Sequence, residues 1–192
     1  MSSRINRTQM VCLHEGERGR SIDPVFINRL IRSLAPAWLR PWPGNNAIRT
    51  VACGARSVLI TRFPGELRAC LEAGGNTTLL VWADLDDDMA DGEQLKEAFR
   101  AEAQSQGIAR EDFEQAVFIF AKDRLENWIE FLLTDTTDES REGERVQYDR
   151  LVRDAAVKLA DKCRTNAVDP RNPPSLEWSC RNWRALVQRM RD

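Results

Sequence analysis

The segment TTLLVWA at residues 77–83 is the feature that most constrains how this chain folds. Its apolar residues follow one another without the alternation that marks a strand with one face in water. Such runs are typical of a strand in a parallel sheet that is covered on both faces. The run leads directly into DLDDD, in which four of five residues are acidic. We therefore expect a buried central strand that ends in a negatively charged loop.

Three more short strands are expected, and helical patterns separate them. The strands cover residues 9–14, 48–53 and 116–121. Helices are expected after an Asp23 cap to residue 34, over 55–73 with a break at Pro64, and over 92–106, 124–133, 146–163 and onward from a Ser175 cap. This alternation predicts an α/β, Rossmann-like fold with a central parallel sheet of about four strands flanked by helices. Residues 1–140 form this domain, and residues 141–192 form a helical extension packed on it.

Charged side chains follow the strands at the point where each strand ends. Glu15 follows the first strand, Asp84 and Asp86 follow the third, and Lys122 follows the fourth with Glu126 close behind. Ligands of parallel sheets bind beyond the carboxyl ends of the strands. We therefore expect one site there, with Glu15, Asp84, Asp86 and Glu126 as metal ligands. Glu15, Asp84 and Lys122 are the expected catalytic residues, and for Glu126 an ordinary surface position is an equal alternative.

The DLDDD run favours a hard divalent cation. Asp84 and Asp86 lie two residues apart, so in an extended chain their carboxylates project to the same side. Two close carboxylates repel each other unless a cation or a proton neutralises them. Oxygen ligands without a thiol or imidazole favour Mg²⁺ or Mn²⁺. A solvated acidic turn is the alternative, whereas an EF-hand calcium loop is disfavoured because Leu95 stands where its bidentate glutamate belongs.

Two glycine turns are candidates for binding phosphate. Gly16 follows Glu15, and glycine allows a close backbone approach or a positive φ. Gly54 and Arg56 lie in a second strand-to-helix turn, which presents backbone N–H groups to an anion. Tight chain connections are the alternative for both turns. The chain lacks the complete phosphate-loop motif, so nucleotide binding of the Walker type is not expected.

Composition excludes several classes of protein. The five cysteines include no CxxC pair and His14 is the only histidine, which disfavours a zinc site. No apolar run approaches the roughly 20 residues of a membrane span, and the N-terminus does not resemble a secretory signal. We expect a cytoplasmic protein without a membrane partner, with reduced and mostly buried thiols. Residues 141–192 are net basic and the preceding part is net acidic, which suits contact with a phosphate backbone or simply solvated helices.

The order of these motifs resembles the Toprim domain. The matching residues are Glu15 and Gly16 after the first strand, Gly54 after the second, Asp84 and Asp86 after the third, and Glu126 after the fourth. The stretches LLVWADLDDD and FIFAKDRLENWIEFLL look closest to small stand-alone Toprim proteins related to OLD nucleases and to the RloB type, which occur in bacterial defence. The resemblance covers roughly residues 9–133, and the PPSLEWSCRNW tail resembles the final helix of that group.

The resemblance implies a metal-dependent nuclease. In the Toprim family the first glutamate acts as general acid/base or metal ligand and the DxD aspartates bind Mg²⁺, so Glu15, Asp84 and Asp86 take these roles by similarity. OLD nucleases carry or accompany an ABC-type ATPase, which suggests an ATPase partner, and a homodimer is also expected. Tyr148, the only tyrosine, lies in a charged segment that does not mark it as a covalent nucleophile. This favours hydrolysis of nucleic acid over strand passage.

Two other functional hypotheses remain open at this stage. The first is a non-catalytic Toprim-fold module that binds a protein or nucleic-acid partner through its tail or through the loop with Trp38 and Trp42. The second is a phosphatase-like enzyme in which one aspartate of DLDDD is the nucleophile. Polynucleotide and phosphate-monoester substrates distinguish the nuclease from the phosphatase.

Overall fold

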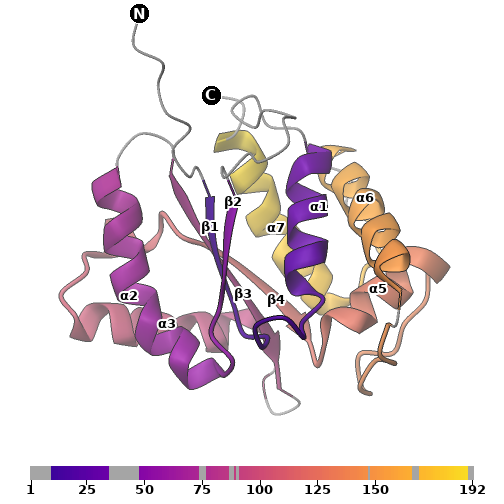
Figure 1. The fold of residues 1–192 in the computed structure, drawn as a ribbon, viewed down its shortest axis with the longest axis horizontal. Coiled ribbons are helices and arrows are strands. Elements are labelled where there is room, and N and C mark those ends of the chain that lie inside the picture. Colours follow the sequence, from indigo (N-terminus) through magenta and orange to yellow (C-terminus); the bar gives the residue numbers. More distant parts are fainter. Residues whose placement is uncertain are drawn as a thin grey trace, which may run out of the picture.

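A four-stranded parallel sheet lies at the centre of the computed structural model, which describes residues 10–34, 48–73, 77–86, 89, 91–146, 148–165 and 169–189. The strands stand in the order β2-β1-β3-β4, and every neighbouring pair is parallel (Figure 1). Their bounds are β1 (Met10–His14), β2 (Ile48–Ala52), β3 (Thr78–Leu85) and β4 (Val117–Lys122). The predicted α/β fold with four parallel strands is confirmed.

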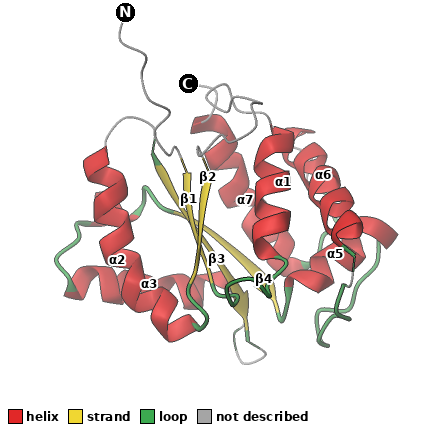
Figure 2. Cartoon of the chain, viewed as in Figure 1, coloured by secondary structure: helices red, strands yellow, loops and turns green. Residues whose placement is uncertain are grey.

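Helices cover both faces of the sheet, as Figure 2 shows in red. The helices are α1 (Asp23–Leu34), α2 (Arg56–Ala73), α3 (Gly92–Ser105), the short α4 (Arg110–Phe113), α5 (Leu125–Thr134), α6 (Asp149–Thr165) and α7 (Pro174–Arg189). One hydrophobic core joins alternate strand residues such as Cys12 and Trp82 to α1, α5, α6 and α7. A second core joins Leu13 and Val81 to α2 and α3 on the opposite face. The period of two along each strand produces this division.

The extension after residue 140 shares a core with the sheet. Val152 and Leu159 of α6 and Trp183 of α7 are fully buried in the same cluster as Trp82 of β3. The rings of Trp82 and Trp183 lie 6.4 Å apart, and Trp128 of α5 packs edge-on against Trp82 at 5.6 Å. Trp128 and Trp183 are therefore core residues, whereas Trp178 is half-buried.

Several local predictions were wrong. Helix α2 continues through Pro64, where a break was expected, and the ring of Pro64 is buried beside Phe63 and Leu67. The third strand extends two residues beyond its predicted end, so Asp84 belongs to β3 and pairs in register with Ala121 of β4. Ser175 does not precede α7 as a cap. It lies within the helix, and its hydroxyl contacts Lys122 and Trp128 instead.

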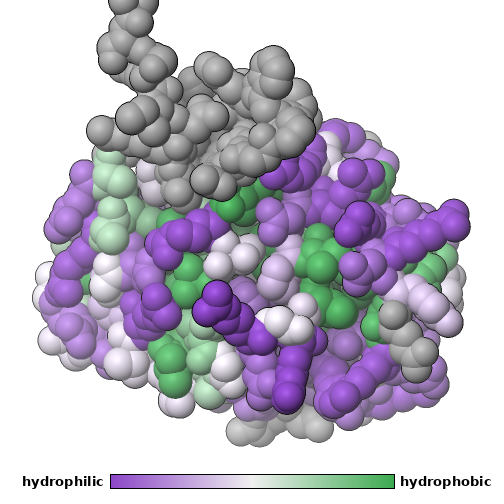
Figure 3. Space-filling view, viewed as in Figure 1, coloured by the Kyte–Doolittle hydropathy of each residue, from purple (hydrophilic) through white to green (hydrophobic). Residues whose placement is uncertain are grey.

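The surface and the thiols agree with the composition. Hydrophilic residues predominate on the described part of the face drawn in Figure 3. All five cysteines are free thiols, four of them are buried and Cys53 is half-buried. None of the helices in the described ranges combines the length and the hydrophobicity needed to cross a membrane.

Candidate active site

The carboxyl ends of β1 and β3 place Glu15 beside Asp84. The two strands pair in register up to His14 and Trp82, and the N–H of Glu15 then donates to the carbonyl of Trp82 at 3.2 Å. The backbone of Asp84 is in turn close enough to the carboxylate of Glu15 to lower the pKa of that group. The structure therefore brings together these two predicted site residues, which lie far apart in the sequence.

Asp84 is the most strongly perturbed acid of this group. Burial raises the pKa of its carboxyl well above the usual range. The negative charges of Asp23, Glu15 and Glu126 raise that pKa further, and the positive charge of Arg56 lowers it. Two strand ends and the first turns of α1 and α5 thus bring four carboxylates near enough for their charges to act on Asp84. We call Glu15, Asp23, Asp84 and Glu126 the carboxylate cluster.

Burial acts on two further members of the carboxylate cluster in the same direction. It is the largest cause of the raised pKa of Glu15, which Arg56 partly offsets. It is also the largest cause of the raised pKa of Glu126, which the helix backbone and Arg124 partly offset. Gathering acids whose charged form is disfavoured costs stability. Proteins therefore keep such groups mainly where function needs them, and they are common in active sites.

Asp23 is a member that sequence reasoning missed. Its Asp-Pro context indicated a helix cap, but α1 begins at Asp23 itself, and the Ser21 hydroxyl accepts the backbone N–H of Asp23 at 3.0 Å. That carboxylate lies 3.4 Å from Nδ1 of the buried His14. A Cβ on Gly16 would lie 2.7 Å from the same carboxylate and 2.3 Å from the Ser21 hydroxyl. Gly16 therefore makes room for Asp23 in this structure.

The two aspartates of the DxD motif have different surroundings. Asp84 is half-buried inside β3, whereas 63% of the Asp86 side chain is exposed after the strand ends. Both carboxylate oxygens of Asp86 accept hydrogen bonds from Arg56. The structure thus places Asp86 against Arg56 at the edge of the carboxylate cluster. Asp87 and Asp88 of the same run, and Trp38 and Trp42, lie outside the described residues.

Arg56 contacts acidic groups from two strand ends. Gly54 has a φ of 78°, a left-handed conformation that turns the chain from β2 into α2, and Arg56 is the first residue of that helix. The Arg56 guanidinium binds Asp86, donates to the carbonyl of Asp84 at 2.6 Å and lies with Nε 3.5 Å from Glu15. The predicted phosphate-binding arginine is thus engaged by carboxylates.

Lys122 lies at the end of β4 but contacts backbone carbonyls. Its Nζ donates to the carbonyl of Asp86 at 2.6 Å and to that of Met89 at 3.2 Å, which are two described residues after β3. Lys122 also lines a cavity of about 500 Å³, which lies between the first turns of α3 and α7 and includes Glu139 and Trp178. The structure does not direct Lys122 into the carboxylate cluster.

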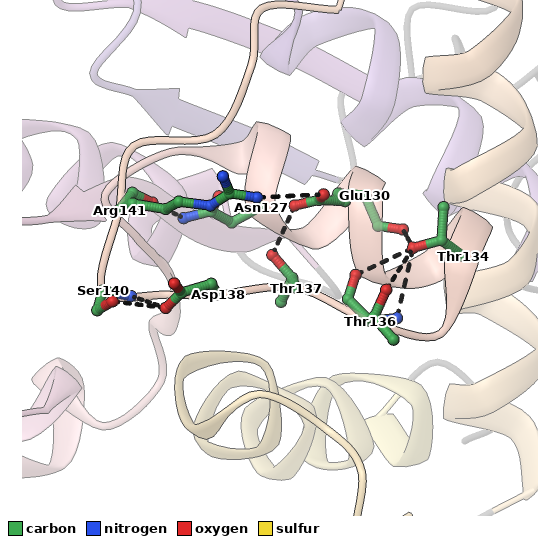
Figure 4. A network of polar contacts seen from close by, with 8 residues as sticks. All are labelled: Asn127, Glu130, Thr134, Thr136, Thr137, Asp138, Ser140 and Arg141. Carbon is green, nitrogen blue, oxygen red and sulfur yellow. Dashed lines mark hydrogen bonds and ion pairs between the residues drawn. The ribbon is translucent and has the colours of Figure 1, made fainter.

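Polar contacts attach the irregular segment after α5 to that helix (Figure 4). The Thr137 hydroxyl donates to Glu130 at 3.0 Å, and the Asn127 amide donates to the carbonyl of Arg141 at 3.1 Å. Thr137 and Arg141 are thus held against α5.

The donors of the carboxylate cluster fit a hard divalent cation in kind, since they are all oxygens. Their positions do not yet form a closed site, because within the described ranges no three acidic, histidine or cysteine side chains are placed to share one metal ion. Arg56 takes up ligand oxygens of Asp86 and lies close to Glu15. Comparison with known proteins adds no assignment: no protein-family model, curated protein or solved structure matches this chain.

Proposed function

We propose that the chain is a Mg²⁺- or Mn²⁺-dependent hydrolase of nucleic-acid phosphodiesters, of the Toprim type. The observation that carries this proposal is the half-buried carboxyl of Asp84 near the end of β3, close to the backbone of Glu15 and within the electrostatic influence of Glu15, Asp23 and Glu126. Four acids in such a place repel each other and lose hydration. A bound divalent cation removes both penalties, which is the usual reason for such a cluster at this edge of a sheet.

The residues divide the chemistry between them. Glu15, Asp84, Asp86 and Glu126 would hold the ion, which supplies charge stabilisation and a more acidic bound water. Burial raises the pKa of Glu15, and a carboxylate that holds its proton more tightly suits a group that takes up or returns a proton. Lys122 keeps the loop after β3 in position through the carbonyls of Asp86 and Met89.

The wider setting is supported by the motif resemblance alone. A small Toprim protein of the OLD and RloB type would work in the cytoplasm as part of an anti-phage or mobile-element defence system. An ABC-type ATPase would be its protein partner, and the active form would be a homodimer. Copurification with a candidate ATPase and sedimentation of the purified chain test these two points.

Cleavage assays with variants test the hydrolase proposal. Single- and double-stranded DNA and RNA are incubated with the full chain in Mg²⁺, Mn²⁺ or chelator, and a phosphate monoester serves as the comparison substrate. We expect metal-dependent cleavage of polynucleotide that Asp84→Asn lowers at least about 100-fold, whereas the exposed control Glu111→Gln leaves it unchanged. Equal cleavage by a folded Asp84→Asn protein rejects the proposal, and turnover of the monoester alone favours the phosphatase.

A non-catalytic interaction module is the second candidate, and the ion pairs of Arg56 favour it. The guanidinium neutralises Asp86 and lies near Glu15. A domain that had kept the Toprim fold without its chemistry would need such an internal cation. Two measurements distinguish the hydrolase from the interaction module. The module should bind no Mn²⁺ at millimolar concentration and should cleave no polynucleotide.

A further inference from the structure

The cavity between the first turns of α3 and α7 lies at the same end of the sheet as the carboxylate cluster. Its volume is about 500 Å³, and its wall includes Leu85 and Lys122, which pair in register at the ends of β3 and β4. Leu85 follows Asp84 directly, and consecutive strand residues point to opposite faces of a sheet. The cavity and Asp84 therefore flank the same strand end. We call this space the Trp178 cavity.

The walls of the Trp178 cavity are mostly apolar, and the indole is held in place. The Trp178 ring stacks on the Phe120 ring at 5.2 Å, and its N–H donates to Glu93 at 3.0 Å. A Cβ on Gly92 would lie 2.6 Å from the indole ring, so a side chain there would push the ring aside. Fixed apolar walls suit a flat, rigid ligand, because little side-chain freedom is lost on binding.

Among the described residues, three charged side chains give the Trp178 cavity its polar contacts. Lys122 is a donor, and Asp91 and Glu139 are carboxylate acceptors. The Ser175 hydroxyl binds the Glu139 carboxylate and also accepts the backbone N–H of Lys122 at 3.1 Å, which positions Glu139 beside the end of β4. Each carboxylate oxygen has a second lone pair, so Glu139 can accept further hydrogen bonds. The cavity therefore complements a flat ligand with more donors than acceptors on one edge.

We infer that the Trp178 cavity is a nucleobase subsite and that the base it selects is guanine. The base-pairing edge of guanine carries two neighbouring donors, N1–H and the N2 amino group, beside the O6 acceptor, whereas each other common base presents one donor group there. Glu139 accepts the two donors as a bidentate pair. Nζ of Lys122 donates to the carbonyls of Asp86 and Met89, and its third N–H is directed to O6.

This inference rests on the proposed function and adds a substrate class to it, namely polynucleotides with a guanine next to the cleaved phosphodiester. The exposed Ser140 belongs to the wall of the Trp178 cavity, so the cavity reaches the surface, where a base of a polynucleotide can enter. The base then lies on one side of the end of β3 while the phosphodiester lies on the side of Asp84.

Binding of mononucleotides to the full chain in chelator tests the subsite independently of cleavage. Isothermal titration calorimetry compares the 5′-monophosphates of guanosine, inosine, adenosine and cytidine, and inosine lacks only the N2 amino group of guanosine. We expect guanosine monophosphate to bind at least about tenfold more tightly than inosine monophosphate, because the lost hydrogen bond is one to a charged group.

Two variants locate the binding. Glu139→Gln replaces the paired acceptors by one acceptor and one donor, so the preference for guanosine over inosine monophosphate should fall to less than about threefold. A merely structural role for Glu139 would weaken both nucleotides equally and keep the preference. Ser140→Phe fills the cavity from its exposed rim and should abolish binding, whereas Ser105→Phe, at the far end of α3, should not. Thermal unfolding reports whether each variant folds, and Ser140→Phe answers the question if Glu139→Gln does not fold.

The outcomes separate the subsite from the proposed function. Guanosine-selective binding that Ser140→Phe abolishes and Ser105→Phe retains supports the subsite. No binding by wild type at millimolar nucleotide, equal binding of the four nucleotides, or unchanged binding by Ser140→Phe overturns it. Cleavage of polynucleotide without guanosine-selective binding rejects the subsite and leaves the hydrolase intact, whereas guanosine-selective binding without cleavage supports the subsite and rejects the hydrolase.

Discussion

The hydroxyl of Ser179 on α7 forms two hydrogen bonds with Phe120 of β4. It accepts the backbone N–H of Phe120 at 3.1 Å and donates to the carbonyl of the same residue at 3.0 Å. Ser175 accepts the N–H of Lys122, and the amide of Asn182 donates to the carbonyl of Phe118. These three side chains form one stripe of α7. The helix thus takes the place of a fifth strand along the edge of the sheet.

Replacing Ser179 tests how much this edge contributes to stability. Ser179→Ala leaves the N–H and the carbonyl of Phe120 without these bonds in a fully buried place. We expect a loss of roughly 2–3 kcal/mol in the free energy of unfolding, measured with urea. Ser105→Ala is the matched control, because the Ser105 hydroxyl is exposed and bonds only to the carbonyl of Glu102. Equal losses in both variants would contradict a special role for the sheet edge.

The strands were predictable because burial on both faces leaves an unbroken apolar run in the sequence. The run before Asp84 predicted a central strand, and β3 is the strand between β1 and β4. The stripe of Ser175, Ser179 and Asn182 has no comparable signal. Serine and asparagine at helical spacing resemble an ordinary solvated helix face, and only the tertiary structure places β4 against them.

The candidate site was likewise predictable only in part. Acids after strands predicted that Glu15 and Asp84 would meet, because parallel strands end at one edge. Asp23 was interpreted as a helix cap, since the sequence does not reveal that α1 begins at Asp23 and that its carboxylate lies beside the buried His14. The engagement of Arg56 by Asp86 depends on the length and direction of a side chain from another element. No spacing rule encodes such a contact.

Gly16 offers a test of the space reserved for Asp23. A Cβ at this position would overlap the Ser21 side chain and the Asp23 carboxylate, so one of them has to move. We expect Gly16→Ala to destabilise the chain by about 1–3 kcal/mol in urea unfolding. If the hydrolase proposal holds, Mn²⁺ affinity should change as well, because Asp23 belongs to the carboxylate cluster.

The matched control for Gly16 is Gly65, which lies inside α2. A Cβ on Gly65 would meet no atom within 4 Å, and its φ is not positive. Alanine restricts the unfolded chain and favours the helix, so Gly65→Ala should stabilise the protein by about 0.5–1 kcal/mol. A loss in Gly65→Ala as large as that in Gly16→Ala would contradict the argument from local space.

Two leucines of α6 test whether the C-terminal helices belong to the same cooperative unit as the sheet. Leu159 is fully buried in the core with Trp82, whereas Leu151 is 40% exposed on the same helix. Leu159→Ala should cost about 3–5 kcal/mol, and Leu151→Ala should cost less than about 1 kcal/mol. Both proteins are unfolded in urea with tryptophan fluorescence and circular dichroism as probes. Two separated transitions, or a small effect of Leu159→Ala, would show that α6 folds independently.

Glu139, which lies outside the carboxylate cluster, should make the stability of the protein depend on pH. Its carboxylate accepts the N–H of Ser175 at 3.3 Å and also binds the Ser175 hydroxyl, which itself accepts the indole N–H of Trp128. Burial raises the pKa of Glu139, the hydrogen bonds from Ser175 lower it, and the charge of Asp123 raises it. Burial is the largest of these effects, so the folded protein holds the proton of Glu139 more tightly than the unfolded chain does.

The sign of the effect follows from proton linkage. Between the ordinary pKa of a glutamate and the raised pKa of Glu139, the folded state binds more protons, so stability decreases as the pH rises through that interval. Glu139→Gln stays neutral at every pH and should lose this part of the decrease, which makes the variant relatively more stable at pH 8 than at pH 4. Urea unfolding across this range measures the difference, with Glu111→Gln as the exposed control. Parallel pH curves for wild type and Glu139→Gln would contradict the raised pKa, because the other buried acids are the same in both proteins.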